Sequence, residues 1–267
     1  MPKLQNSPGL SSLLEHFEGK EVPKGLREVM DLRARMTPEE TEEYQRMLER
    51  EREEQTRQLI RETIEHSASA RIRRSGIPEA YREANLELFQ GKGVWSTLVA
   101  YESAIANGGH EGLVMRGDVG TGKTTAGCAI LNRIVKKKSV RFITFYRFVM
   151  LMNDVFIHRT RSREEVFNEY AEVPVLMIDD LGKELTSQNA KNAILMLWSI
   201  IDWRRGAMKP TIVTTQYASD DLYKLLMNAG GDQANARAIV DRLKEYVNIP
   251  FEGSSLRVQA KLPLERI

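Results

Sequence analysis

Gly117-Asp118-Val119-Gly120-Thr121-Gly122-Lys123-Thr124 is the stretch of this 267-residue sequence that decides the fold. It fits the phosphate-loop pattern G-x-x-x-x-G-K-[ST]; an apolar run, Leu113–Met115, precedes it, and a helical pattern from Thr125 to Val135 follows. The glycines allow successive backbone N–H groups to turn towards phosphate oxygens, and the N-terminal end of the following helix favours the same anion. The spacing differs from the G-x-G-x-x-G pattern of dinucleotide-binding folds. The sequence therefore predicts a site for a nucleoside triphosphate.

Two side chains of this loop carry the expected chemistry. Lys123 supplies a mobile cation for the outer phosphates, and the Thr124 hydroxyl is placed to bind Mg²⁺. The alternative is an ordinary glycine-rich turn between a strand and a helix. The residues expected to contact the nucleotide are Gly117, Asp118, Val119, Gly120, Thr121, Gly122, Lys123, Thr124 and Thr125.

Composition narrows the class of protein. The chain is 42% hydrophobic and 28% charged, which allows one α/β domain with an appendage. Its net charge of +2 gives no global basic field, so a nucleic-acid site would have to be a local patch. The single cysteine, Cys128, excludes an internal disulfide and a cysteine-based zinc site. No apolar run approaches the roughly 18 residues of a membrane span, and the N-terminus lacks a signal-peptide pattern, so we expect a soluble, cytoplasmic protein without a membrane partner.

Residues 1–66 have the character of a helical region that does not bury itself in a core. Helical patterns are expected near Ser11–Phe17 and Lys24–Met36, and Thr37-Pro38-Glu39-Glu40 combines an N-cap, a proline at the first helical position and a capping-box glutamate. The helix that begins there is expected to reach about Glu65, although residues 49–58 contain no aliphatic side chain. This region is either a solubilising, partly disordered tail or a domain that docks a partner protein.

The rest of the chain alternates strands with helices. Residues 67–92 are expected to form a linker and lead-in, and residues 93–267 the nucleotide-binding domain. This alternation predicts an α/β fold with a five-stranded, mostly parallel sheet covered by helices on both faces. The five expected strands are Leu113–Arg116, Val140–Thr144, Val175–Asp179, Thr211–Thr215 and Val247–Phe251.

The second half of the predicted site follows the third strand, which ends in two carboxylates. Asp179 would hold the magnesium shell, and Asp180 would orient or deprotonate the attacking water. The alternative is an acidic turn, because Asp-Asp-Leu-Gly has good turn chemistry. An acid directly after the magnesium aspartate favours NTPases with an additional strand between the two motifs over nucleoside-monophosphate kinases and small GTPases. Gln216, after the next strand, is the candidate sensor of the γ-phosphate; a simple polar cluster at a strand end is the alternative.

The sequence resembles a known family, the AAA+ helicase loaders DnaC and DnaI, with the IstB-like transposition helpers as close relatives. The resemblance covers about residues 71–260. Besides the phosphate loop, it rests on Arg74–Pro78, Ile178–Gly182, Ile201–Arg205, Pro210–Thr215 and Ala236–Leu243. It implies an AAA+ ATPase domain over residues 93–267, ATP as the nucleotide, and self-association through the ATP site.

The resemblance also implies an arginine that one subunit presents to its neighbour's site. By position this finger is Arg237 or Arg242, and a guanidinium can neutralise charge that spreads over the γ-phosphate. The alternative for both is a surface ion pair on an exposed helix. Arg257 matches a later sensor-like arginine. Asp180 stands where most AAA+ ATPases have Glu, so hydrolysis is expected to be slow or switch-like. Gln216 stands where Asn is usual and is one methylene longer.

Residues 146–170 form a basic segment that also bears aromatic side chains. Members of this clade insert helical elements here, and such a segment suits single-stranded DNA, with phosphates on arginines and bases on rings. The arginines and histidine concerned are His158, Arg159, Arg161 and Arg163. The alternative, preferred for Phe148 and Phe156, is that the aromatic side chains belong to the core.

The resemblance therefore implies an ATP-dependent loader of a replicative hexameric helicase, docked through residues 1–66 and engaging single-stranded DNA. That region has no Cys/His cluster, so it is not the zinc-bearing version found in some loaders. Two alternatives stay open: an IstB-like ATPase that acts on duplex DNA for a transposase, and a nucleotide-gated adaptor with little turnover.

Overall fold

The computed structural model describes residues 36–183, 190–230 and 233–253, and the chain divides into two units, Met1–Thr63 and Ile64–Ile267. The helices expected within residues 1–35 and the sensor-like Arg257 lie outside the described residues. Among the residues that are described, no helix combines the length and the apolar character that a membrane span requires.

A long helix, α3 (Pro38–Arg74), begins where the sequence predicts it. The Thr37 backbone N–H donates to the Glu40 carboxylate (2.8 Å), and the Glu40 N–H donates to the Thr37 hydroxyl (3.2 Å), so the predicted capping box is confirmed. The helix runs through residues 67–70, which the sequence suggested as a linker, and ends at Arg74 rather than near Glu65. Residues 67–70 contain neither glycine nor proline, and their alanines favour helix.

All five predicted strands form one parallel sheet, in the order β2-β3-β4-β1-β5. The strands are β1 (Leu113–Gly117), β2 (Val140–Thr144), β3 (Val175–Asp179), β4 (Thr211–Thr215) and β5 (Val247–Phe251). β4 lies between β1 and β3, so the phosphate loop after β1 and the carboxylates after β3 emerge on either side of β4 at the same edge of the sheet. The predicted fold class is confirmed.

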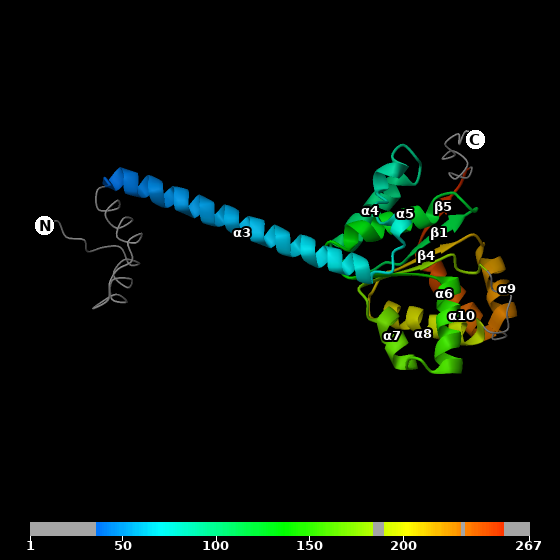
Figure 1. The fold of residues 1–267 in the computed structure, drawn as a ribbon. Helices are drawn as coiled ribbons and strands as arrows, with labels where there is room; N and C mark the ends of the chain where they lie inside the picture. Colours follow the sequence, from blue (N-terminus) through cyan, green and yellow to red (C-terminus); the bar gives the residue numbers. More distant parts are fainter. Residues whose placement is uncertain (1–35, 184–189, 231–232, 254–267) are drawn as a thin grey trace, which may run out of the picture. The chain divides into compact units, whose positions relative to one another are not determined.

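Helices cover both faces of this sheet (Figure 1). One face carries α4 (Trp95–Ala106) and α5 (Lys123–Ile134), with the short 3-10 turns η1 (Glu79–Tyr81) and η2 (Leu86–Phe89) of the lead-in. The helices that contribute to the other face are α6 (Phe145–Asn153), the π-helical turn η3 (Asp154–His158), α7 (Arg163–Ala171), α8 (Lys191–Gly206), α9 (Ser219–Gly230) and α10 (Gln233–Lys244).

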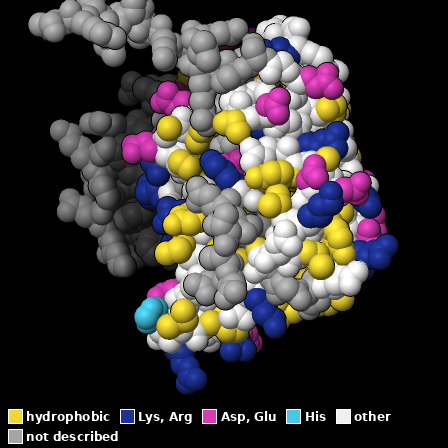
Figure 2. Space-filling model, turned by 90° about the vertical axis from the view of Figure 1, so that its right-hand side faces the viewer, with side chains coloured by type: hydrophobic (Ala, Val, Ile, Leu, Met, Phe, Trp, Pro, Cys, Tyr) yellow, Lys and Arg dark blue, Asp and Glu magenta, His cyan; other side chains and the backbone are white. Residues whose placement is uncertain are grey.

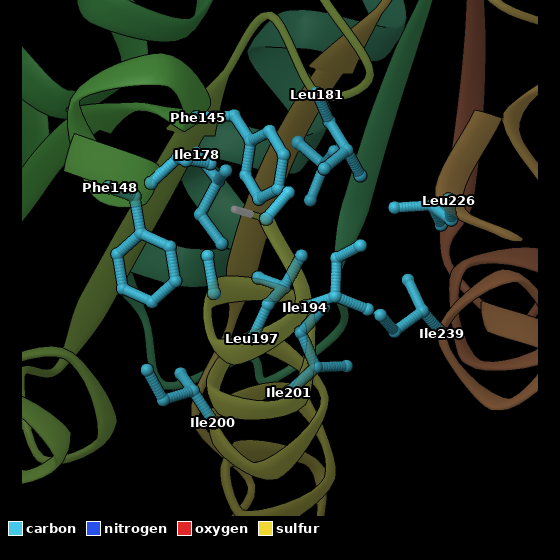
Figure 3. Packing of buried hydrophobic residues seen from close by; sticks show 14 of the residues in the cluster. Phe145, Phe148, Ile178, Leu181, Ile194, Leu197, Ile200, Ile201, Leu226 and Ile239 are labelled. Atoms are coloured by element: carbon cyan, nitrogen blue, oxygen red, sulfur yellow. The ribbon is translucent and has the colours of Figure 1, made fainter. Parts of the chain in front are cut away.

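Each face has its own hydrophobic core. Figure 3 shows the core beneath α6 and α8, where Phe145 and Phe148 meet Ile178 of β3 and Leu197 of α8. Phe145 and Leu197 are fully buried, and each fully buried side chain of this kind contributes about 1.5–3 kcal/mol. On the outer surface, positive and negative side chains are interspersed among hydrophobic ones on the face drawn in Figure 2. That mixture agrees with the small net charge.

The Arg-Ser-Gly-Ile-Pro lead-in lies against the edge strand β2. The Phe142 N–H donates to the Ser75 carbonyl (2.7 Å), while the Ser75 hydroxyl donates to the Ile72 carbonyl (2.7 Å) at the end of α3. Gly76 has φ +77°, and a Cβ there would lie 2.6 Å from the Phe142 oxygen, so only glycine fits. Arg71 donates to the Val135 and Lys136 carbonyls (2.6 Å each) just beyond the end of α5. The lead-in therefore packs as part of the unit Ile64–Ile267 that contains the sheet.

Arg204 is a fully buried arginine at the end of α8. Its guanidinium donates to the carbonyls of Tyr170, Ala171 and Val173 before β3 and of Pro210 before β4, and to the Thr211 hydroxyl. Burial lowers the pKa of Arg204 to about 10, which leaves it charged at neutral pH. One side chain thus joins α8 to the starts of two neighbouring strands.

Arg204→Ala is expected to destabilise the protein by about 3–5 kcal/mol, because it leaves several buried carbonyls without a donor. The adjacent Arg205 is the matched control: it is exposed and makes one ion pair, to Glu245 (2.6 Å), so Arg205→Ala is expected to cost no more than about 1 kcal/mol. Urea unfolding of both variants measures the difference. Equal stabilities would contradict the bridging role of Arg204.

Candidate nucleotide site

The phosphate loop joins β1 to α5 and has the backbone that the motif requires. Gly122, the residue before α5, has φ +98° and Gly120 has φ +86°, conformations that glycine adopts without strain. A Cβ at Gly117 would lie 2.0 Å from the Phe251 oxygen of β5, so this glycine is required by close packing. The loop therefore offers backbone N–H groups and a helix N-terminus to an anion, and the residues fit a phosphate chain.

The Lys123 side chain folds back onto the phosphate loop. Its Nζ donates to the carbonyls of Gly117 and Asp118 (2.8 Å each), and the side chain is buried. These carbonyls hold the ammonium group beside the loop, where phosphate oxygens would be its stronger partners.

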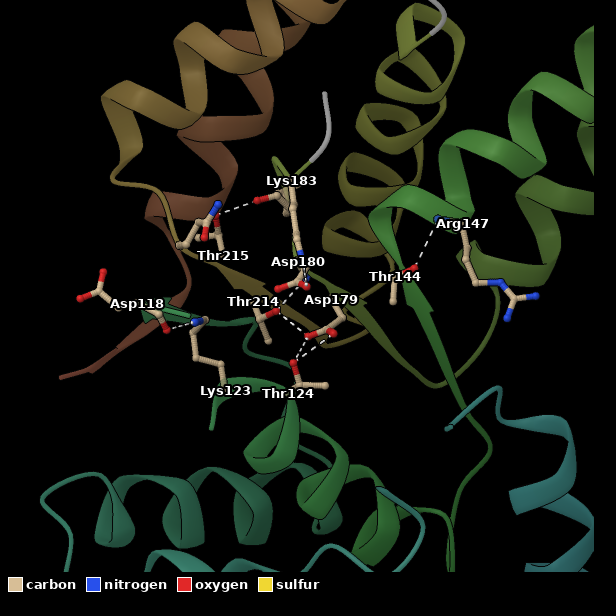
Figure 4. Close-up of polar contacts among 12 residues, drawn as sticks. Asp118, Lys123, Thr124, Thr144, Arg147, Asp179, Asp180, Lys183, Thr214 and Thr215 are labelled. Atoms are coloured by element: carbon tan, nitrogen blue, oxygen red, sulfur yellow. Dashed lines mark hydrogen bonds and ion pairs between the residues drawn. The ribbon is translucent and has the colours of Figure 1, made fainter. Parts of the chain in front are cut away.

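Asp179 is buried at the end of β3 between two threonine hydroxyls (Figure 4). Thr214 Oγ1 of β4 donates to Asp179 Oδ1 (2.6 Å), and Thr124 Oγ1 of α5 donates to the same carboxylate (3.0 and 3.1 Å). Burial raises the pKa of Asp179, and the neighbouring Asp180 carboxylate acts in the same direction, against the two hydroxyl hydrogen bonds. A cation would relieve the cost of burying this charge.

The donor set fits Mg²⁺, which prefers oxygen ligands and retains several waters. Thr124 and Asp179 supply one hydroxyl and one carboxylate, and phosphate oxygens and water would complete the shell. Within the described residues there is no group of three or more His, Cys, Asp or Glu that could form an all-protein metal site.

Asp180 follows in a sharp turn that β4 holds in place. It has φ +56°, a left-handed conformation that Asp tolerates better than most residues, and its N–H donates to Thr214 Oγ1 (2.8 Å). The Leu181 N–H donates to the Thr214 carbonyl, and the Thr215 hydroxyl donates to the Leu181 carbonyl (2.8 Å each). Thr214 thus positions both predicted carboxylates. Sequence reasoning did not single it out, although its place near the end of the next strand was a signal.

The loop and Asp180 line one cavity of about 300 Å³, whereas the buried Asp179 is not among its lining residues. Gln216 lines it, with its side-chain amide donating to the Tyr217 hydroxyl (2.7 Å), so the candidate sensor shares the cavity with Asp180. Two lining residues, Tyr81 and Lys183, were not predicted. The lining residues are Tyr81, Val119, Gly120, Gly122, Lys123, Thr124, Thr125, Asp180, Lys183 and Gln216.

The two candidate finger arginines lie on α10 and differ in their contacts. Arg242 donates through Nε and Nη2 to Asp202 Oδ1 on α8 (3.1 Å each) and lies 3.5 Å from a Glu245 carboxylate oxygen. Arg237 is exposed and makes no ion pair or side-chain hydrogen bond with the described residues. Neither arginine lines the cavity of its own subunit.

Residues 146–170 are largely helical, spanning most of α6, then η3 and most of α7. The core assignment of Phe148 is confirmed: it is buried and meets Tyr170 edge to face (5.7 Å between ring centres). Phe156 packs against the same core, with the Arg163 guanidinium 4.0 Å from its ring centre. Arg161 is paired with Glu169 (2.6 Å).

Comparisons with known proteins agree with this fold and site. A family model described as IstB-like ATP-binding protein matches residues 37–263. The chain is 27% identical over 158 residues to the replicative helicase loader DnaC of Escherichia coli, covering 57% of this chain and 63% of DnaC. It is 30% identical over 150 residues to a Mycobacterium tuberculosis protein described as an ATP-binding protein in an insertion sequence, covering 55% of this chain and 56% of that protein. The matched region spans less than two thirds of either relative.

Solved structures show the same fold. The crystal structure of DnaI matches with a TM-score of 0.55 at 21% identity, covering 67% of this chain and 96% of that chain. The replication initiator DnaA bound to AMPPCP and single-stranded DNA matches with a TM-score of 0.54 at 20% identity, covering 67% of this chain and 51% of that chain.

The fold and the site define an ATP-binding protein of the AAA+ class. Because the family match covers most of the chain, the chain belongs to the IstB-like ATP-binding proteins, with distant homology to the DnaC and DnaI helicase loaders, and it shares its fold with DnaA. The resemblance inferred from the sequence motifs is confirmed.

Thr214→Val is expected to lower ATP turnover about tenfold or more, because it removes the hydroxyl that positions Asp179 and Asp180. Thr214→Ser retains that hydroxyl and is expected to stay near the wild-type rate. Steady-state phosphate release with Mg²⁺, together with the unfolding temperature of each variant, checks this. Wild-type turnover in a folded Thr214→Val protein would contradict the positioning role.

Proposed function

We propose that this protein is an ATP-dependent loader of a replicative hexameric helicase onto single-stranded DNA. The observation that carries the proposal is a long helix that leads directly into the nucleotide-binding fold. α3 runs from Pro38 to Arg74, and its end is held by Arg71, which donates to the Val135 carbonyl just after α5, while the next residue, Ser75, accepts from the Phe142 N–H of β2. DnaC and DnaI, named as replicative helicase loaders, are among the relatives.

Hydrolysis is assigned to the residues around the cavity. Lys123 would bind the outer phosphates, Thr124 and Asp179 would hold Mg²⁺, and Asp180 would orient the attacking water while Gln216 would sense the γ-phosphate. Bound Mg²⁺ would neutralise phosphate charge. Asp180 is one methylene shorter than the usual glutamate and lies in a turn fixed by Thr214, which supports slow, switch-like turnover rather than a motor cycle.

Single-stranded DNA is assigned to the exposed side of α6 and η3. Tyr146 and Met150 are about half exposed and lie one turn apart on α6, beside Arg147; Arg159 and His158 are exposed beyond them. Arginines for phosphates and a ring for base stacking are the groups that such a strand requires. Arg161 is occupied by Glu169 and contributes less.

A second candidate function has its own support. The family model is that of IstB-like proteins, and one relative is described as belonging to an insertion sequence. An ATPase that acts on duplex DNA for a transposase would use the same nucleotide site. It differs from the loader in its partner and in its preference for duplex over single-stranded DNA.

Full-length protein is expected to retain the cognate replicative helicase in a pull-down with ATP, and a chain shortened to residues 67–267 is expected to lose it. The shortened chain keeps Arg71, Ser75 and both cores, so ATP binding is the control for folding. No helicase binding by the full-length protein, combined with tight binding to duplex DNA, would favour the transposition helper instead.

Mixing two inactive variants tests the finger arginine. Asp180→Asn subunits lack the water-orienting acid but carry intact arginines, whereas Arg237→Ala or Arg242→Ala subunits have the reverse defect. If an arginine acts in the neighbour's site, its variant is expected to regain ATP turnover when mixed with Asp180→Asn. An arginine whose variant recovers no activity in the mixture has no role in the neighbouring subunit. Equal rates of ATP turnover for the wild-type and Asp180→Asn proteins, with single-stranded DNA present, would mean that no hydrolysis depends on Asp180 and would favour the nucleotide-gated adaptor.

A further inference from the structure

Lys183 is a positively charged side chain at the end of the cavity where the predicted hydrolytic groups lie. It lines that cavity together with Asp180 and Gln216. Lys183 lies in the turn after β3, whereas the phosphate loop follows β1. Its Nζ lies 3.5 Å from Asp180 Oδ2 (Figure 4), and both side chains are nearly half exposed, at 49% and 42%. The site therefore has a second lysine besides Lys123.

Hydrogen bonds hold the backbone turn that carries Lys183, while its side chain is nearly half exposed. The Lys183 N–H donates to the Asp180 carbonyl (3.2 Å), and Leu181 between them is buried and bonded to β4. Gly182 has φ +95°, and a Cβ there would lie 2.8 Å from the Tyr217 ring. The turn thus holds the lysine at the cavity wall, and its flexible four-carbon chain lets the ammonium group change partners.

The ion pair with Asp180 is weak enough to be exchanged. Exposed pairs of this kind contribute little free energy, because water solvates both charges and the long side chain loses freedom. An ammonium group binds phosphate oxygens through charge-assisted hydrogen bonds, which are stronger. Asp180 and Gln216 mark the end of the cavity where a terminal phosphate is expected.

We propose that Lys183 is a ligand of the terminal phosphate that leaves Asp180 for the γ-phosphate, and thereby makes the site distinguish ATP from ADP. The exchange also frees the Asp180 carboxylate to accept a hydrogen bond from water when the triphosphate is bound. This inference rests on ATP binding at the proposed hydrolytic site and does not depend on the helicase as partner.

The chain supplies a matched control. Lys224–Asp221 (3.7 Å) is also a lysine three residues after an aspartate, is also exposed, and does not line the cavity. Lys183→Met and Lys224→Met in the full-length protein remove equivalent charges and equivalent local ion pairs. A difference in nucleotide affinity between the two variants is therefore due to the position of Lys183 in the cavity.

Calorimetric titration with Mg²⁺ and either AMPPCP or ADP tests the proposal. Lys183→Met is expected to weaken AMPPCP binding about tenfold and ADP binding less than about twofold, while Lys224→Met changes neither. Equal losses for both nucleotides, or no loss, would overturn the assignment. Wild-type protein that binds neither nucleotide would refute the ATP site itself; wild-type protein that binds ATP but no helicase would refute the loader and leave the Lys183 result standing.

Discussion

The hydrogen bond from Thr214 to Asp179 is the contact on which the candidate site depends. It joins β4 to β3 at the edge of the sheet where β1 delivers the phosphate loop, and a second hydroxyl, from Thr124, reaches the same carboxylate. Burial disfavours the charged form of Asp179 and raises its pKa, and the two hydroxyl hydrogen bonds act against that effect. The same Thr214 hydroxyl accepts the Asp180 N–H, which fixes the residue proposed to orient water.

Two arginines outside the cavity join parts of the nucleotide-binding unit that are distant in sequence. Arg204 donates to carbonyls that precede β3 and β4. It thereby holds together the starts of the two strands whose other ends carry Asp179 and Thr214. Arg71 satisfies carbonyls just beyond the end of the P-loop helix and connects that helix to α3. Each uses a planar guanidinium with several donors, which a lysine would not match. The strand starts and the helix end are thereby held by side chains far away in sequence.

The phosphate loop, the five strands and the capping box at Thr37 were predictable because each has a local cause. Glycine conformations, alternation of apolar runs and capping hydrogen bonds involve residues close together in the chain. The continuation of α3 through residues 67–70 was missed, because a Ser/Ala stretch resembles a linker in composition while remaining compatible with helix. Phe148 was assigned to the core correctly, and Phe156 is partly buried and packs against the same core, because large aromatic side chains gain most from burial.

The sequence by itself determined the class of fold, the triphosphate loop and the two carboxylates that follow a buried strand. Only the tertiary structure decided that β4 lies between β1 and β3, and hence that Thr214, Gln216 and Lys183 gather around Asp180. It also decided that Arg242 binds Asp202 while Arg237 stays unpaired among the described residues. Motifs record local backbone requirements, whereas contacts between distant residues depend on strand order and packing, which no short pattern encodes.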